Sequence, residues 1–153
     1  MRGRRYEGSF ELGVKSGRGI LILGQGDVYE GEFRSDDYGG EGTLTLSNGD
    51  IMAGTWHRGQ LDGRANIMYK SGDVYEGDFH VGKFHGKGRF VFAGGRGWYE
   101  GGYELGRQHG QGLRVFANNN RYDGTFRDGE LDGEGIMEYI NGDGAATPLS
   151  LRR

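Results

Sequence analysis

Glycine-rich segments are the first feature of this sequence that could do chemistry. Gly-x-Gly recurs five times in phase, for example at residues 17–19 and 86–88. Such a segment cradles phosphate when it joins a strand to the N-terminus of a helix. Here the segments are periodic and each one begins a predicted strand. We therefore interpret them as structural glycines of a repeat rather than as a phosphate site.

The four histidines, His57, His80, His85 and His109, could in principle ligate a metal ion. A metal site needs convergent ligands that are oriented by further hydrogen bonds. His85 and His109 occupy equivalent places in successive turns, and the sequence gives them no acidic partner. We interpret them as turn residues and expect no metal or cofactor.

Nucleophilic catalysis has little support in this chain. There is no cysteine, and no serine lies in a nucleophile elbow. Asp and Glu are plentiful, but no pair is set apart from the repeating pattern. The sequence therefore predicts that the protein is not an enzyme.

A basic band runs through residues 80–121, which hold seven Lys and Arg against two Asp and Glu. The band comprises Lys83, Lys87, Arg89, Arg96, Arg107, Arg114 and Arg121. It is either ordinary solubilising charge or a contact for an acidic helix or an anionic headgroup. The net charge of −3 argues against nucleic acid as a partner.

The composition favours a folded repeat protein. Glycine accounts for 34 of 153 residues, far above the usual ~7%, and 19 aromatic residues (8 Phe, 9 Tyr, 2 Trp) argue against disorder. No apolar run is long enough to span a membrane, and MRGRRYEG has no apolar core of a secretory signal. We expect a cytoplasmic location.

The chain repeats itself every 23 residues, and one extra residue falls in the loop 93–97. Six units begin at residues 6, 29, 52, 75, 99 and 122 and extend to about 143, followed by a short tail at 144–153. Each unit has glycine at its third and twelfth positions and an aromatic residue at its fifth. Its fourteenth residue is glycine except for Ala65, and its sixteenth is apolar except for Arg114.

These positions alternate as in β-strands, so each unit is predicted to be a β-hairpin. The fold expected is all-β, a single-layer antiparallel sheet of six stacked hairpins. In the expected register the first residue of a unit faces the eighteenth, so that Gly31 faces Leu44. The aromatic ring at the fifth position then covers the glycine at the fourteenth. A slip of two residues would keep the same faces.

The aromatic columns share one face of the predicted sheet, and no predicted helix covers them. They are either simply the core of the repeats or also a groove for a partner segment. The residues of the predicted groove are Tyr29, Phe33, Leu44, Trp56, Tyr75, Phe79, Phe90, Phe92, Tyr99, Tyr103, Phe116, Tyr122 and Phe126. Arg114 interrupts an apolar column and is expected to project into this groove.

The segments VYEGEF with GEGTLTL (28–33, 40–46) and VYEGDF with GKGRFVF (74–79, 86–92) closely resemble the MORN (membrane occupation and recognition nexus) repeat. The third unit departs from this pattern, with MAGTW (52–56) and GRA (63–65). The resemblance implies an elongated sheet of stacked hairpins with a ring-lined groove. It also implies scaffolding and protein–protein contact, often at cytoskeletal or membrane-associated structures, dimerisation through terminal repeats in some members, and a proposed binding of phospholipid.

The function expected is therefore that of a non-enzymatic scaffold or adaptor. Its aromatic groove would hold a helix or an extended segment of a protein partner, and the basic band would help to orient it. Two alternatives remain open: self-assembly through the terminal hairpins (6–10 and 135–139), and peripheral binding to anionic phospholipid.

Overall fold

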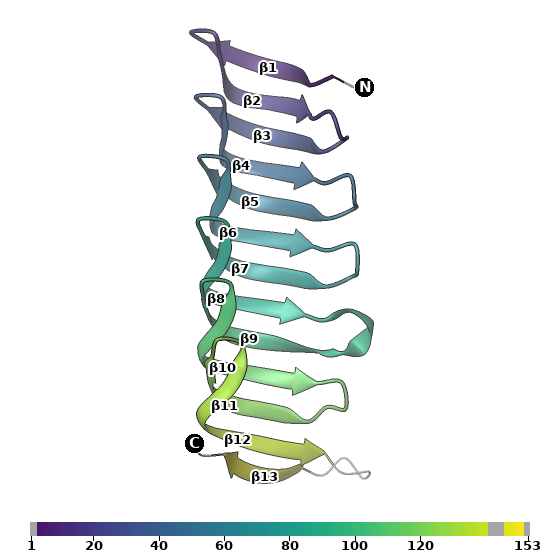
Figure 1. The fold of residues 1–153 in the computed structure, drawn as a ribbon, viewed down its shortest axis with the longest axis vertical. Helices are drawn as coiled ribbons and strands as arrows, with labels where there is room; N and C mark the ends of the chain where they lie inside the picture. The colour runs from purple at the N-terminus through teal and green to yellow at the C-terminus, as the bar shows by residue number, and fades with distance from the viewer. Residues whose placement is uncertain (1–2, 141–145, 152–153) are drawn as a thin grey trace. The chain divides into compact units, whose positions relative to one another are not determined.

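The computed structural model describes residues 3–140 and the backbone of residues 146–151. By its internal contacts the chain divides into two compact units. The first unit is Met1–Lys70 with Phe79–Gly82, and the second is Ser71–Asp78 with Lys83–Arg153. Figure 1 shows that both units consist of strands that follow one another in chain order. The all-β prediction is confirmed.

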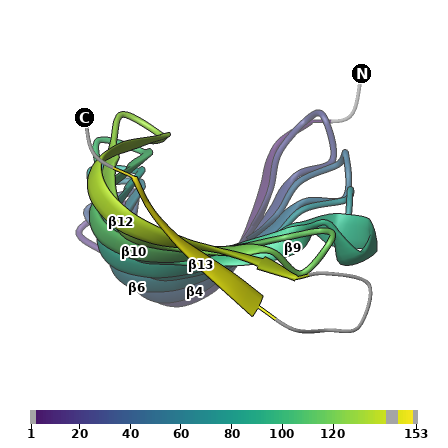
Figure 2. The same cartoon turned by 90° about the horizontal axis from the view of Figure 1, so that it is seen from below.

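In the first unit each strand pairs antiparallel with the next. The strands are β1 (Arg5–Glu11), β2 (Val14–Ile22), β3 (Val28–Arg34), β4 (Asp37–Thr45), β5 (Ile51–His57) and β6 (Gln60–Met68). Figure 2, an end-on view, shows that strands such as β4 and β6 are bent along their length.

The second unit has the same construction. Its strands are β7 (Val74–His80, whose last two residues belong to the first unit), β8 (Lys83–Val91), β9 (Gly97–Glu104), β10 (Arg107–Phe116), β11 (Arg121–Arg127), β12 (Glu130–Ile140) and β13 (Ala146–Leu151). The extra residue of the loop 93–97 is accommodated by a short 3-10 turn, Ala93–Gly95. Part of the expected tail is thus a strand, with Ile140 paired to Ala146 in the antiparallel β12–β13 ladder.

Tight two-residue turns join the strands of each hairpin. In the turn between β9 and β10, Leu105 has φ of 49° and Gly106 has φ of 87°. Two consecutive left-handed residues give the turn a twist that matches the twist of the strands. Glycine adopts this conformation without the Cβ penalty, which explains its recurrence at the eighth position of five units.

Successive repeats are joined at their other turns by carboxylates that accept backbone hydrogen bonds. Asp27 Oδ1 accepts from the Ser47 N–H at 2.8 Å, and Asp50 Oδ1 accepts from the Lys70 N–H at 2.8 Å. The hydrogen bond from Ser47 is the main reason that the pKa of Asp27 is lowered. The Asp that ends each of these turns therefore links one repeat to the next.

The strand register differs from the one expected by two residues. Tyr29 pairs with Leu44, Gly31 with Gly42 and Phe33 with Tyr38, so the predicted pairing of Gly31 with Leu44 is wrong. The tight turn at Ser35 and Asp36 sets Arg34 opposite Asp37, and an irregularity in β4, where residues 39–41 lie opposite a single residue of β3, then brings Gly42 opposite Gly31. Two extra residues on one strand shift the pairing without exchanging the two faces of the sheet, because side chains alternate with a period of two.

The shifted register changes which ring covers which glycine. The Tyr29 ring lies across Gly42, and a Cβ on Gly42 would overlap the tyrosine hydroxyl. The Tyr29 hydroxyl instead donates a hydrogen bond of 2.8 Å to the carbonyl of Glu32. The fifth-position rings lie opposite the twelfth-position glycine of the preceding repeat, as Trp56 does opposite Gly40. The expectation that they cover the fourteenth-position glycine is wrong.

The core is a layer of interlocking rings on one face of the sheet, which we call the ring face. Within a repeat, the Tyr99 and Tyr103 rings meet edge to face, with centroids 5.2 Å apart. Between repeats, the Tyr99 and Phe126 rings do the same at 5.0 Å. Edge-to-face contacts between rings at such distances are favourable beyond the area that they bury.

Burial in this layer makes Tyr29 and Tyr99 weaker acids than free tyrosine, which predicts that the fold loses stability in alkali. Burial is the main cause that raises the pKa of Tyr29 and of Tyr99 to about 12. An unfolded tyrosine ionises near 10. Their contribution to stability is therefore complete below pH 10 and is lost as the pH rises from 10 towards 12.

We expect the urea midpoint of unfolding to fall between about pH 9 and about pH 11. Absorbance titration of phenolate should show a group of tyrosines that ionise together with unfolding. Ionisation of all tyrosines near pH 10 in a protein that stays folded would contradict this prediction.

Candidate functional site

The structure places nine of the thirteen predicted groove residues in the core, with at most 6% of each residue exposed. These nine are Tyr29, Phe33, Trp56, Tyr75, Phe79, Tyr99, Tyr103, Tyr122 and Phe126. Their rings contact one another and offer little surface to a partner. The other four, Leu44, Phe90, Phe92 and Phe116, are partly exposed.

Three of these four, Phe90, Phe92 and Phe116, line one open hollow on the ring face of the second unit. This hollow, the Phe90 hollow, has a volume of 480 Å³. Arg107 and Arg114 of the basic band also line it. The structure thus brings the exposed rings together with two of the predicted cations.

A second hollow, the Met137 hollow, lies next to the first and has a volume of 570 Å³. It is lined by Met137 and Tyr139 of β12, together with Arg96 and two residues of the Phe90 hollow, Arg114 and Phe116. The predicted groove did not contain Met137 or Tyr139, although they occupy the sixteenth and eighteenth positions of their repeat, as Arg114 and Phe116 do in theirs. The Arg114 side chain therefore lies where the two hollows meet.

Arg114 lies between two buried tyrosines of the sheet, since it pairs with Tyr99 on β9 and Tyr122 on β11. Its guanidinium carbon is 3.9 Å from the centroid of the Phe92 ring and 5.3 Å from that of Phe116. A guanidinium at this distance from a ring face is held by a cation–π interaction. Burial is the largest cause that lowers the pKa of Arg114.

The rest of the basic band does not form one continuous surface. Arg96 Nη2 lies 3.1 Å from Asp73 Oδ1, and Arg121 Nε lies 3.6 Å from Glu138 Oε2. Arg89 precedes Phe90 in β8, so its side chain lies on the face opposite the rings, where the guanidinium covers Trp98 at 4.9 Å. Lys83, Lys87 and Arg107 are exposed.

Carboxylates lie near two of the histidines, and for His109 this differs from the expectation from the sequence. His109 Nε2 lies 3.1 Å from Glu104 Oε2, and His80 Nδ1 lies 3.7 Å from Asp62 Oδ1. Glu104 and His109 meet because the β9–β10 hairpin brings its two strands together, whereas Asp62 and His80 lie on the neighbouring strands β6 and β7 of successive repeats. In the described part of the chain, no group of three or more potential ligands could hold a metal ion.

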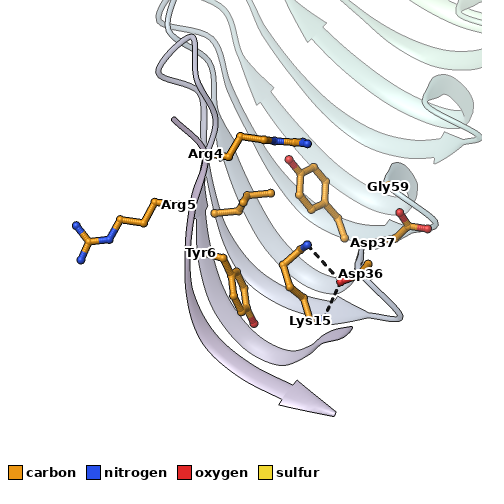
Figure 3. A pocket seen from close by; sticks show the side chains of 9 residues that line it. Arg4, Arg5, Tyr6, Lys15, Asp36, Asp37 and Gly59 are labelled. Carbon is orange, nitrogen blue, oxygen red and sulfur yellow. Dashed lines mark hydrogen bonds and ion pairs between the residues drawn. The ribbon is translucent and has the colours of Figure 1, made fainter. Parts of the chain in front are cut away.

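A further hollow, of 330 Å³, lies in the first unit and is shown in Figure 3. Lys15 points at Asp36, with 3.2 Å between Lys15 Nζ and Asp36 Oδ1, whereas Arg5 points away and pairs with Glu7. The Lys15 N–H also donates to Asp36, and this is the largest cause that lowers the pKa of the Asp36 carboxyl. The charges that line this hollow are largely compensated, which makes the hollow a weaker candidate for a binding site than the Arg114 site.

The fold and this site define a class of protein, the repeat scaffold that presents one ring-lined face of a sheet of hairpins. Matches to the MORN repeat cover residues 6–28, 29–51, 53–74, 75–95, 99–121 and 122–144, and the chain therefore belongs to the MORN repeat family. The comparison with curated proteins gave no match.

MORN repeats are in general scaffold modules that interact with proteins or membranes, and proteins built from them are typically non-enzymatic. They often occur in membrane-associated proteins. Among the residues that the structure describes, no helix is long and apolar enough to cross a bilayer.

Proposed function

We propose that this protein is a non-enzymatic scaffold or adaptor that binds a helix or an extended segment of a protein partner on the ring face of its second unit. The observation that carries this proposal is the pair of adjoining hollows lined by Phe90, Phe92 and Phe116. Within residues 3–140 the only helical element is a three-residue turn, so no helix covers these rings.

The ring layer favours binding because it fixes the shape of the surface in advance. Phe90 and Phe92 contact each other at 4.7 Å, and Phe84 packs on both Phe90 and the buried Tyr103. Side chains that are already ordered lose little conformational entropy when a partner binds. Partly exposed aromatic rings beside an arginine are also the residue types that contribute most to protein–protein interfaces.

Self-assembly remains a second candidate, because among the described strands β1 pairs only with β2. The β1 strand presents Phe10 with 63% of its surface exposed, and an unprotected edge strand can pair with another chain. We place the adaptor at a cytoskeletal or membrane-associated structure by analogy with the family.

Site-specific photo-crosslinking tests the proposed binding face. A photoreactive phenylalanine analogue at position 116 lies on the ring face, whereas the same analogue at position 115 lies on the other face of β10. We expect a single partner segment to be crosslinked from position 116 and not from position 115. Excess unlabelled protein should abolish this crosslink.

Equal crosslinking from both positions, or none from position 116, would contradict the proposed function. A crosslink between two copies of this chain would favour self-assembly instead. Because the two variants differ by one position in the same strand, a general loss of folding would affect both of them.

A further inference from the structure

Two arginines of the second unit lie over aromatic rings, but their surroundings differ. Arg89 covers Trp98 on one face of the sheet and is paired in the β8–β9 register with Glu100, so a carboxylate stands next to it. Arg114 covers Phe92 on the ring face, and its partners in the register are Tyr99 and Tyr122. Arg89 therefore has both a ring and a carboxylate beside it, whereas the neighbours of the Arg114 guanidinium are rings.

The charge of Arg114 is not compensated within the described structure. No carboxylate oxygen of residues 3–140 lies within 4.0 Å of its guanidinium. The titratable groups that affect its pKa are Tyr103 and Arg96, and neither is a carboxylate. Partial burial of a cation costs free energy unless an anion or hydrogen-bond acceptors compensate it.

The equivalent position in every other repeat is apolar. It is occupied by Leu21, Leu44, Ile67, Phe90 and Met137. An apolar side chain would therefore fit at residue 114, and the fold does not require a cation there. A cation that stability does not explain is a reasonable candidate for recognition.

We infer that Arg114 binds a carboxylate of the partner, and that the partner segment is an acidic peptide with apolar side chains on both sides of one Asp or Glu. This inference rests on the function proposed above and specifies its partner. A guanidinium that is stacked on a ring still has its edge available for two parallel hydrogen bonds to a carboxylate. The Phe90 and Met137 hollows, which meet at Arg114, would hold the flanking apolar side chains.

An anionic membrane is a less suitable occupant of this site. A lipid surface is attracted by several cations that are presented together. Here Arg96 and Arg121 already contact carboxylates, Arg89 lies on the other face, and apolar hollows flank Arg114. Arg107 also lines the Phe90 hollow but is exposed, whereas Arg114 is recessed between the two apolar surfaces, and a recessed arginine suits one carboxylate on a peptide better than a plane of headgroups.

Selection from a displayed library of random peptides tests this inference with the whole chain. We expect wild-type protein to select peptides with Asp or Glu between apolar residues, and the Arg114→Leu variant to lose this selection. Leucine already occupies the same place in two repeats, so this variant should fold at least as well as wild type, which circular dichroism and urea unfolding will check. Arg89→Leu is the matched control and should select the same peptides as wild type.

The affinity of one selected peptide then measures how much Arg114 contributes to binding. Its Kd should rise about tenfold or more with Arg114→Leu, or when its own Asp or Glu is replaced by the amide, and should change less than about twofold with Arg89→Leu. Arg114→Glu should select basic peptides instead.

Three outcomes would overturn the inference. The first is acidic peptides that bind Arg114→Leu as tightly as wild type. The second is selection of purely apolar peptides that compete with the crosslink from position 116, which would leave the proposed function intact. The third is flotation of wild type, but not Arg114→Leu, with vesicles of anionic phospholipid in the absence of any acidic selection.

Discussion

Replacement of Tyr99 by alanine is expected to lower the free energy of unfolding by about 4 kcal/mol. The Tyr99 ring is completely buried and meets the rings of Tyr103 and Phe126 edge to face. Because the core is a single layer of rings, no second layer can move in to fill the space. The ring is also shared between two repeats, so its loss weakens both hairpins.

The Tyr99→Phe variant separates the hydroxyl from the ring. The Tyr99 hydroxyl donates a buried hydrogen bond of 2.7 Å to the carbonyl of Gly102, and its removal should cost about 1 kcal/mol. Tyr139, which is 44% exposed, provides the control, and Tyr139→Ala should change stability by about 0.5 kcal/mol or less. Urea unfolding measures all three variants, and equal losses for Tyr99→Ala and Tyr139→Ala would contradict the ring-layer interpretation.

Replacement of Gly42 by alanine is expected to lower the free energy of unfolding by about 3 kcal/mol. The new Cβ would overlap the Tyr29 hydroxyl and ring, and the opposing Gly31 backbone leaves the ring no room to retreat. The third repeat shows how the chain avoids this clash. Where it has Ala65 in place of the glycine, it also has Met52 in place of the tyrosine.

A double-mutant cycle with Tyr29→Met tests this coupling. The loss in free energy of unfolding of the double variant should be smaller than the sum of the two single losses by about 1 kcal/mol or more. The reason is that a flexible methionine leaves space for the Cβ. Gly106→Ala is the control. That glycine has φ of 87° with nothing within 4 Å of its Cβ position, so only backbone strain of about 1 kcal/mol is expected. Additive losses for Tyr29→Met and Gly42→Ala would refute the coupling.

The repeat of 23 residues was sufficient to predict the hairpins, because alternation of glycine and aromatic residues is a local property of each strand. It did not predict the register. The irregularity at residues 39–41 depends on how the chain bends within the sheet, and Gly40, with φ of 96°, permits it. The sequence showed that a glycine stands at the position of Gly40 in every repeat. It did not show that this glycine allows the pairing of the two strands to shift.

The candidate site was also predicted in part from the sequence and in part not. Arg114 could be singled out from the sequence because it interrupts an apolar column. The burial of rings such as Tyr29 and Tyr122 could not be predicted. The sequence pattern does not distinguish a ring that packs on its neighbours from one that lines an open surface. Phe92, Phe116, Met137 and Arg114 come together only because the sheet places equivalent positions of successive repeats side by side.

The sequence by itself determined the fold class, the number of repeats and the face on which each side chain lies, since all three follow from local periodicity. The tertiary structure decided the pairing register, which rings are buried, and which rings and cations surround Arg114. These depend on contacts between residues of different strands, where one bulge or one turn changes every neighbour of a side chain. Arg114 is visible in the sequence as an exception, and the structure shows the two rings and two hollows that surround it.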